Sequence, residues 1–521
     1  MSIDSDTHPP APIDDPPAKS ASPFRPDPPL RQLRYGGWAF YFSAALCAVF
    51  MVRVLGADWN SHFRAIWPDA LFPKEGYVPI ARLGPFRPRF YFAFRPIGYP
   101  LYLWAFGRSS HPAVIGQAAL YCAAVLGLCT TAWKVFRSRV IAGLTIALIL
   151  GIAVQPKYSM WTTQILSESL SITVGFAAIA AWWRFAAEPT RKRAIWGWIF
   201  VIAWCLVRDS NVFAAIGVIV PAALLIAWRA RSFDRKIRRA LAFGAAALVL
   251  TGVYSYVSQE TAGPSALVLQ DLIGVRVLPD ATLSNWFAEH GMPLDDALRT
   301  RSGKAGFEDT FWHSTDPKFA RYFRWSNASG RTTYARSLLA LPTHYRDLFY
   351  KDLPSMLKAD MSYYDSHHVY GTLPHQMPMQ LGGPSTRKGL TIWLLLSGVA
   401  LATTAGATVR LRRRRYFGLA LFGIVALALA LSELFLAWFG EPLEIQRHAI
   451  GAVSMLAVLL VIIVATGLDA GVEMITAGRR KPDETLNGQA PDDTIPDDPI
   501  PDDPTSNDSA PDDDESVSLG V

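Results

Sequence analysis

Apolar segments of about 18 to 20 residues recur along this chain, and each is long enough to cross a hydrocarbon core roughly 30 Å thick. A segment in lipid must satisfy its own backbone hydrogen bonds, so such segments fold as helices unless they close a barrel. Hydrophobic residues make up 51% of the 521 residues, which is high for a soluble protein. We therefore predict an all-α polytopic membrane protein with about ten transmembrane helices. The predicted spans are residues 38–55, 112–133, 139–156, 164–183, 194–208, 211–228, 240–257, 389–409, 417–438 and 449–468.

Lysine and arginine are concentrated in alternate short loops, at residues 134–139, 191–193, 229–239 and 410–415. Cytoplasmic loops of membrane proteins carry this excess of positive charge. The pattern predicts an N-in/C-in topology, with both termini in the cytoplasm. Residues 1–29 lack the basic and apolar regions of a cleavable signal peptide. We therefore expect a multi-pass protein of the cell inner (plasma) membrane.

The predicted spans form two blocks, separated by a long segment rich in aromatic and polar residues. We expect short amphipathic helices near 281–300 and 331–358, which make this segment a helical outer cap. The C-terminal tail repeats Pro-Asp-Asp, and such a composition favours disorder. The predicted parts are a disordered cytoplasmic tail (1–34), a first transmembrane block with a long first outer loop (35–257), an extracytoplasmic segment (258–388), a second transmembrane block (389–470) and a disordered acidic cytoplasmic tail (471–521).

The charge is divided unevenly along the chain. The formal net charge is +7, although the tail from Pro482 onward is acidic and holds no Lys or Arg. The remainder is strongly basic in its predicted cytoplasmic loops, which favours contact with the anionic headgroups of membrane lipids. Nucleic acid is not an expected partner, because the basic residues are scattered among loops and form no single basic face.

Four spans carry ionisable residues near one end, and the predicted topology places all four ends on the outer side. Charge inside a membrane is costly, so such residues are retained mostly for function. The first cluster contains Asp58, just after the first span, and Asp69 in the same loop. A partly desolvated carboxylate there suits a general base, although an acid that only ends a helix is the alternative. The same predicted outer loop contains Arg95, although arginines are usually concentrated in cytoplasmic loops. An arginine at this position favours an anion-binding role.

The second cluster is a polar stripe in the fourth span. Its members follow the i, i+3, i+4, i+7 spacing of one helix face: Gln164, Ser167, Glu168 and Ser171. A glutamate facing lipid is costly, so we expect Glu168 to face the interior of the bundle and to belong to the site. The alternative is a structural salt bridge from Glu168 to a partner such as Arg208.

The third cluster interrupts the apolar run between the fifth and sixth spans. Arg208 and Asn211 are three residues apart there and are expected to share a helical face. Arginine suits a phosphate because its planar fork donates two parallel hydrogen bonds. The alternative is an ion pair between Arg208 and Asp209 in a tight outer turn.

The fourth cluster lies where the chain enters the last span. Glu444, Arg447 and His448 are spaced i, i+3, i+4, so one helix face presents an acid, a cation and an imidazole. The start of a helix prefers anions, so the helix dipole does not explain arginine and histidine at this position. Their presence favours an anionic ligand over a helix cap.

Together these clusters resemble the GT-C superfamily of membrane glycosyltransferases, and are similar to its bacterial relatives of the protein O-mannosyltransferases. The likeness covers residues 35–470 and lies in short motifs: the acid after the first span, the Arg-Pro-Ile-Gly-Tyr-Pro run that begins at Arg95, and the sequences around Glu168, Arg208 and Arg447. The resemblance implies a polyprenyl-phosphate sugar donor, an envelope glycan or lipid acceptor, and a site facing outside or the periplasm.

The resemblance also implies roles for individual residues. Asp58 would be the base, with Asp69 as second choice, while Arg208, Arg447 and His448 would lie near the lipid phosphate. No cofactor is assigned and no metal-ligand cluster is predicted, although a divalent metal is left open. The candidate catalytic residues are Asp58, Asp69 and Glu168, and the candidate substrate-binding residues are Arg95, Arg208, Asn211, Glu444, Arg447 and His448.

Three other functions stay open at this point. The first is a transporter or flippase of a lipid-linked or anionic substrate, although transporters usually place polar residues near the middle of the membrane on repeated broken helices. The second is a non-catalytic membrane scaffold that recruits partners through its acidic tail. The third is an O-antigen polymerase or ligase.

Overall fold

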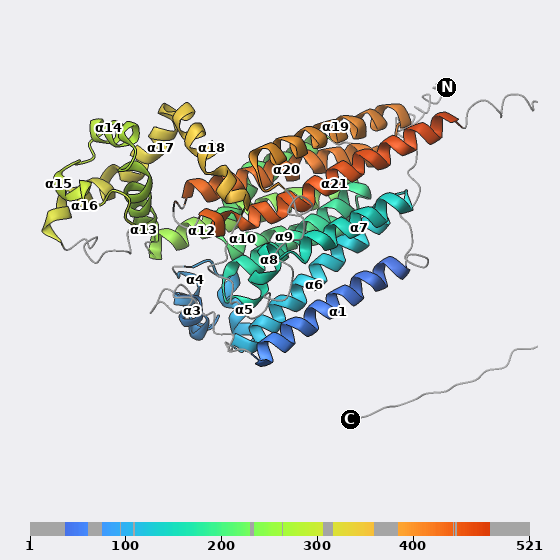
Figure 1. Ribbon diagram of the computed structural model, residues 1–521, viewed down its shortest axis with the longest axis horizontal. Coiled ribbons are helices and arrows are strands. Elements are labelled where there is room, and N and C mark those ends of the chain that lie inside the picture. The colour runs from blue at the N-terminus through green and yellow to red at the C-terminus, as the bar shows by residue number, and fades with distance from the viewer. Residues whose placement is uncertain are drawn as a thin grey trace, which may run out of the picture. The chain divides into compact units, whose positions relative to one another are not determined.

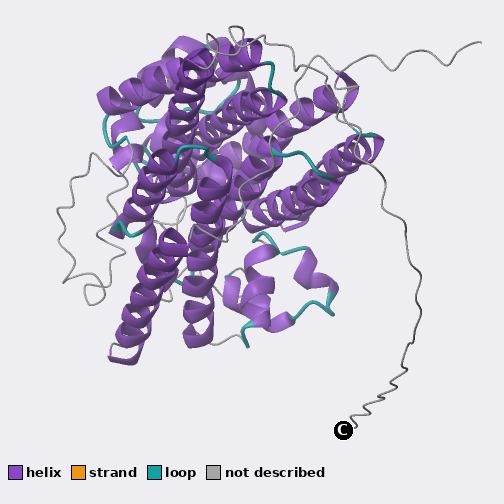
Figure 2. Ribbon diagram, turned by 90° about the vertical axis from the view of Figure 1, so that its right-hand side faces the viewer, coloured by secondary structure: helices purple, strands orange, loops and turns teal. Residues whose placement is uncertain are grey.

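The described part of the chain is helical. The computed structural model describes residues 37–60, 76–93, 95–107, 110–229, 234–262, 264–305, 316–358, 384–440, 442 and 445–479. Within these ranges the chain forms helices joined by turns and contains no strand (Figure 2). The all-α class is thus confirmed for these residues. The two predicted disordered tails lie almost entirely outside them.

Seven helices are long and apolar enough to cross a membrane, which indicates a multi-pass membrane protein. α21 is the most buried of the seven. The seven helices are α6 (Ser110–Val135), α9 (Ser167–Ala187), α11 (Asp209–Arg229), α12 (Arg235–Ala262), α19 (Arg387–Leu411), α20 (Arg414–Gly440) and α21 (Ile445–Arg479).

The predicted number of ten spans is not confirmed. Of the other three, α1 (Gly37–Asn60) has a described apolar stretch of Tyr41–Val52, which is shorter than a span, and α10 (Arg191–Val207) has 17 residues. The third, α7 (Arg139–Ala153), is followed by a bend of 65° and a short continuation, Lys157–Thr163, formed by α8 (Pro156–Ser159) and η2 (Met160–Thr163). This bent pair counts as an eighth span if its two parts are taken together.

Within the unit Met1–Ile475 the helices pack closely side by side (Figure 1). α9 lies against α6, α10 and α20. Glycines allow two of the closest approaches, as is usual between membrane helices. A methyl group on Gly418 would lie 2.2 Å from the carbonyl oxygen of Ala186, and one on Gly467 would lie 2.5 Å from Cα of Ala400. Any larger side chain at either position would force the helices apart.

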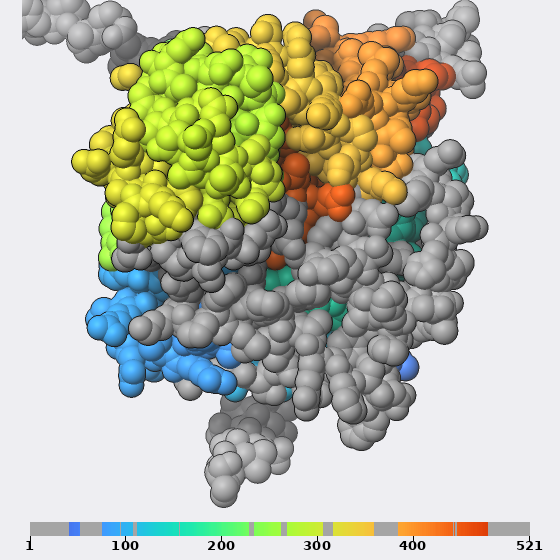
Figure 3. Space-filling model, turned by 60° about the vertical axis from the view of Figure 1, so that its left-hand side comes forward, coloured from blue at the N-terminus to red at the C-terminus, as the bar shows by residue number. Residues whose placement is uncertain are grey.

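The segment between α12 and α19 is also helical. The expected amphipathic helices near 281–300 and 331–358 are present, and residues of this segment gather on the face seen in Figure 3 (yellow-green and yellow). Aspartate side chains cap two of its helices, because Asp280 accepts from Leu283 N and Asp295 from Leu298 N. The elements are α13 (Pro264–Asp271), η3 (Leu272–Val277), α14 (Ala281–Glu289), α15 (Asp296–Arg299), η4 (Pro317–Phe319), α16 (Ala320–Trp325), η5 (Ser326–Gly330), α17 (Arg331–Ala340) and α18 (Pro342–Lys358).

Polar contacts attach this helical segment to the end of α20. Arg276 donates to the carbonyl oxygen of Trp438 at 2.7 Å, and its guanidinium lies 4.0 Å from the centroid of the Trp438 ring. The indole N–H of Trp438 donates to Asp352 at 2.9 Å, and the hydroxyl of Tyr334 donates to the carbonyl oxygen of Phe439 at 3.2 Å. The segment is thus held beside the end of α20, close to where α21 begins.

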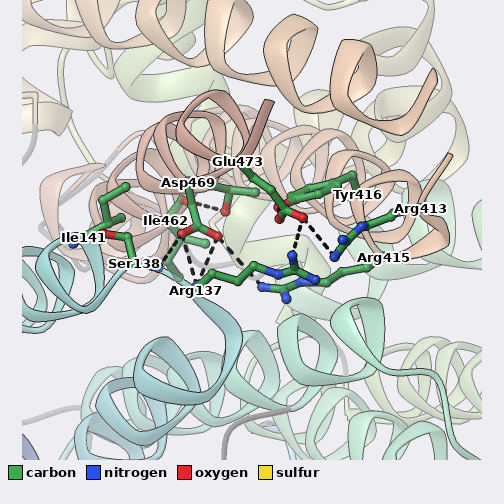
Figure 4. Close-up of polar contacts among 10 residues, drawn as sticks. Arg137, Ser138, Ile141, Arg413, Arg415, Tyr416, Ile462, Asp469 and Glu473 are labelled. Atoms are coloured by element: carbon green, nitrogen blue, oxygen red, sulfur yellow. Dashed lines mark hydrogen bonds and ion pairs between the residues drawn. The ribbon is translucent and has the colours of Figure 1, made fainter. Parts of the chain in front are cut away.

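A buried cluster of charged residues lies toward the other end of α21 (Figure 4). The Asp469 carboxylate accepts from the backbone N–H groups of Arg137 and Ser138 at 2.9 to 3.2 Å. Glu473 pairs with Arg137 and with Arg413, the latter at 2.8 Å, and accepts from the Tyr416 hydroxyl. These contacts join the turn between α6 and α7, the turn between α19 and α20, and α21. Because their charges are paired with one another, we interpret the cluster as structural.

Candidate functional site

Five of the predicted site residues come together at the opposite end of α21. Glu168 lies in the first turn of α9, Arg208 and Asn211 lie around the break between α10 and α11, and Arg447 and His448 lie in the first turn of α21. About 21 residues of α21 separate His448 from Asp469, so this cluster lies roughly 30 Å from the charged cluster of Figure 4.

The described residues do not contain all of the predicted site. Asp69 and Glu444 lie outside them. Asp58 falls in the last turn of α1, which continues to Asn60, but its side chain is not described. The assignments of Asp58 and Asp69 as candidate bases, and of Glu444 as a substrate-binding residue, therefore stay predictions.

Glu168 forms a buried ion pair with Arg447. The distance between Glu168 Oε1 and Arg447 Nε is 3.3 Å, and the two side chains are 3% and 8% exposed. The carboxylate lies in the first turn of α9, where the helix dipole favours a negative charge. The alternative of an interhelical salt bridge is thus realised, with Arg447 as the partner in place of Arg208.

The predicted four-residue stripe is wrong at Gln164. The backbone of Gln164 is extended, with φ −97° and ψ 138°, and α9 begins only at Ser167. The buried amide of Gln117 donates at 2.9 Å to the carbonyl oxygens of both Thr162 and Gln164. These hydrogen bonds satisfy main-chain groups that a continuing helix would otherwise satisfy, so the chain can break between η2 and α9.

Arg208 stands at the break between two helices. Its backbone is extended, with φ −144° and ψ 139°, and so it does not share a helical face with Asn211 as predicted. Its guanidinium contacts His448 twice, with Nη2 2.8 Å from Nδ1 and Nη1 3.3 Å from the carbonyl oxygen. A guanidinium only donates, so Nδ1 accepts and the imidazole is neutral with its proton on Nε2.

Arg208 has no ion-pair partner within the part of the chain that the structure describes. No carboxylate oxygen of those residues lies within 4.0 Å of its guanidinium, although the residue is only 7% exposed. The predicted alternative of a pair with Asp209 is wrong, because the Asp209 carboxylate accepts from the Ser255 hydroxyl at 2.8 Å. A buried guanidinium without a carboxylate is costly unless an anion binds it.

Asn211 holds three helices together beside Arg208. Its amide nitrogen donates to the Ser171 hydroxyl on α9 at 3.2 Å and to the carbonyl oxygen of Trp204 on α10 at 2.8 Å. The residue itself is on α11 and is fully buried. These contacts give Asn211 a positioning role for the α10–α11 break that carries Arg208.

The segment that follows α1 reaches the same cluster through Tyr77 and Arg95. The Tyr77 hydroxyl donates to Ser167 at 2.9 Å, and the Arg95 guanidinium lies 5.3 Å from the centroid of the Tyr77 ring. Burial raises the pKa of Tyr77, which the Arg95 charge partly offsets, so the hydroxyl stays a neutral donor. Tyr77 lies in α3 (Tyr77–Leu83), between α1 and the short helices α4 (Pro88–Tyr91) and α5 (Gly98–Ala105).

The Arg-Pro-Ile-Gly run packs against the end of α10. A methyl group on Gly98 would lie 2.6 Å from the carbonyl oxygen of Leu206, so only glycine allows this approach. Arg95 then lines a pocket beside the α10–α11 break, whose other walls include Leu206, Asp209, Tyr254, Ser255 and Gln259. This small pocket brings an arginine and a carboxylate together next to the α10–α11 break.

Sequence reasoning missed Glu433, which lies beside the cluster. It is on α20 and fully buried, and within the described ranges neither carboxylate oxygen has a hydrogen-bond partner. A methyl group on Gly451 of α21 would lie 2.9 Å from Glu433 Oε1, 3.5 Å from Ser171 Oγ and 3.9 Å from Arg208 Nη1. The available signal was that Glu433 is the only Asp, Glu, Lys or Arg inside the predicted span 417–438.

The site thus combines three arginines, a neutral histidine and two glutamates, one paired with Arg447 and the other without a partner among the described residues. Such a group of cations suits a phosphate more than a neutral ligand. Among the described residues, no three His, Cys, Asp or Glu side chains are grouped in a way that could hold a metal ion. The members are Arg95, Arg208, Arg447, His448, Glu168 and Glu433.

Comparison with known proteins gives a distant likeness to solved structures alone. No model of a protein family matches the chain, and neither does any curated protein. Among solved structures, the chain is similar to the archaeal oligosaccharyltransferase AglB from Archaeoglobus fulgidus, solved in complex with an inhibitory peptide and a dolichol-phosphate. The identity is 13% and the TM-score 0.34, over 84% of this chain and 51% of AglB, so this chain spans half the length of that protein. The resemblance to the GT-C superfamily, including its O-mannosyltransferase relatives, stays a prediction.

Proposed function

We propose that this protein is a membrane glycosyltransferase that moves a sugar from a polyprenyl-phosphate donor to an extracytoplasmic glycan or lipid acceptor. The observation that carries the proposal is Arg208, a buried guanidinium that contacts His448 and pairs with no described carboxylate. A lipid phosphate would supply the missing anion, because two of its oxygens can accept the parallel hydrogen bonds of the planar guanidinium.

The surrounding contacts support an anion site at Arg208. Arg447 lies in the first turn of α21, one residue before His448, and pairs with Glu168 at 3.3 Å. Arg95 borders the neighbouring pocket. Three cations in a setting of low dielectric constant act far more strongly on a phosphate than they would in water. An apolar bundle around them also suits a ligand with a polyprenyl chain.

The proposed reaction is a single displacement. A carboxylate of the first outer loop, Asp58 or Asp69, takes the proton of an acceptor hydroxyl, whose oxygen attacks the anomeric carbon of the donor sugar. A new carbon–oxygen bond forms as the bond from that carbon to the phosphate oxygen breaks. Arg208 and Arg447 stabilise the negative charge that develops on the departing lipid phosphate.

Glu168 takes a different role in this scheme from the catalytic one first expected. Its carboxylate is buried and paired with Arg447, and it also lies 3.5 Å from the Ser167 hydroxyl. A carboxylate engaged in this way does not accept a substrate proton without breaking the pair. We assign Glu168 as a residue that positions Arg447. The proposed site faces the outer side of the plasma membrane.

Replacement of the two candidate bases tests the reaction. With radiolabelled polyprenyl-phosphate sugars and an envelope acceptor fraction, we expect Asp58→Asn or Asp69→Asn to slow label transfer by about 100-fold or more, the usual contribution of a general base. The variant Asp347→Asn is the matched control, since this aspartate is exposed and pairs with its neighbour Arg346. Full transfer by both site variants would exclude the mechanism. Label that crosses the membrane without joining an acceptor would support the transporter instead.

A further inference from the structure

Tyr77 is a buried tyrosine of α3 to which the proposed reaction gives no role. It is 5% exposed, and its ring meets the Tyr99 ring of α5 edge to face, with the two centroids 4.9 Å apart. A buried tyrosine usually finds a hydrogen-bond partner for its hydroxyl. Here the partner is Ser167, the first residue of α9, and the two oxygens are 2.9 Å apart. The hydroxyl thus joins the segment after α1 to the membrane bundle.

Ser167 connects Tyr77 to the ion pair of the site. A serine hydroxyl can accept one hydrogen bond while it donates another, so Ser167 accepts from Tyr77 and donates to Glu168 Oε2 at 3.5 Å. The other oxygen of that carboxylate, Oε1, pairs with Arg447 Nε at 3.3 Å. All four side chains are buried, and satisfied polar chains of this kind rigidify the groups that they join.

The ring of Tyr77 contacts a second arginine of the site. The Arg95 guanidinium lies 5.3 Å from the ring centroid, which is within the range of a cation–π interaction. Tyr77 therefore contacts Arg95 through its ring and reaches Arg447 through its hydroxyl. Two cations that belong to different parts of the chain are thus held by one side chain.

The start of α9 is also held by contacts that do not involve Tyr77. The Tyr99 hydroxyl donates to Gln117 at 2.7 Å, and the Gln117 amide donates to two carbonyl oxygens of the linker before α9. These bonds stay in place when the Tyr77 hydroxyl is removed. Loss of that hydroxyl should therefore change how the Glu168 carboxylate is oriented more than where α9 lies.

We propose that Tyr77 is a positioning residue that aligns Arg447 and Arg95 to bind one lipid phosphate. This inference rests on the proposed function, because it assumes that a phosphate binds at this cluster. The hydroxyl orients the Glu168 carboxylate through Ser167, and that carboxylate fixes the Arg447 guanidinium. A guanidinium that is already aligned loses less freedom when the phosphate binds, so the affinity is higher.

The test is the affinity of the purified full-length protein for a short-chain polyprenyl phosphate in detergent micelles. Tyr77→Phe keeps the ring beside Arg95 and removes only the hydroxyl. It is expected to weaken binding by about three- to tenfold, the effect of one buried hydrogen bond. Ser167→Ala interrupts the same chain of contacts and should weaken binding by the same factor. The double variant should bind no more weakly than either single variant, because both changes break one chain.

Tyr121→Phe is the matched control. Its hydroxyl is also buried, and it donates at 2.8 Å to the carbonyl oxygen of Ala153 on α7, a helix that contributes no residue to the cluster. The control loses one buried hydrogen bond and should still bind like the wild type, per folded protein. A structural role alone would not separate Tyr77→Phe from this control.

Wild-type affinity of Tyr77→Phe would overturn the inference and leave the proposed function intact. A double variant weakened by the product of the two single factors would do the same, since the two hydroxyls would then act separately. If Tyr77→Phe does not fold, wild-type affinity of Ser167→Ala is the overturning result. Absence of binding by the wild type itself would overturn both proposals.

Discussion

Replacement of Arg208 with glutamine is expected to weaken the binding of a polyprenyl phosphate by roughly 100-fold, which corresponds to about 3 kcal/mol. The guanidinium is 7% exposed and its contacts to His448 leave donors on the fork for a ligand. Glutamine keeps a polar side chain of similar reach but lacks the charge and the paired donors. Sugar transfer should fall at least as much, because the departing phosphate carries more charge than the bound donor.

The measurement is a binding isotherm on the purified protein, with inorganic phosphate as a second ligand. Arg193→Gln is the matched control, since this arginine is also next to a helix end but pairs with Glu188 at 2.7 Å, away from the site. We expect the control to bind like the wild type. Equal affinity of Arg208→Gln and the wild type would remove Arg208 from the site. Equal binding of inorganic phosphate and the lipid would show that the polyprenyl chain contributes nothing.

The second large effect concerns the buried pair of Glu168 and Arg447. Replacement of Arg447 with methionine leaves the Glu168 charge buried without its partner, and should lower the free energy of unfolding by about 3 to 5 kcal/mol. The double variant Glu168→Gln with Arg447→Met removes both charges. It is expected to recover most of the stability, because no uncompensated charge remains.

Activity should not follow stability in this series. The double variant lacks the Arg447 cation, so its transfer rate should remain low even though the protein is folded. Unfolding in detergent reports the stability of each variant, and the radiolabel assay reports transfer. If the double variant recovered both stability and sugar transfer, the pair of Glu168 and Arg447 would have only a structural role. A stable Arg447→Met single variant would contradict the buried geometry itself.

Much of the site's composition was predictable from charge in apolar segments. Glu168, Arg208 and Arg447 lie within or at the ends of predicted spans, where a charge is costly, and the three residues do meet at one end of the bundle. Which of these residues pair with each other was harder to predict, because spacing along one helix does not show which residue of another helix contacts it. Glu168 pairs with Arg447 on α21, whereas the structural alternative considered from the sequence named Arg208 as the partner.

Helix boundaries depended on contacts between distant residues. The stripe that included Gln164 assumed one continuous helix, but Gln117 on α6 binds the carbonyl oxygens of the linker and α9 begins three residues later. The ten spans were counted from apolar length alone. That length says nothing of the 65° bend after α7, and it does not distinguish α10, with 17 residues, from a full span.

Location of the bound lipid phosphate tests the central claim most directly. A photoreactive polyprenyl phosphate would be crosslinked to the wild-type protein in membranes, and the labelled peptides would be identified by mass spectrometry. We predict label at the end of α10 and the start of α11 around Arg208, and in the first turn of α21 around His448, with loss of both under excess unlabelled lipid. Label confined to the charged cluster of Asp469 and Glu473, at the other end of α21, would contradict the proposed site.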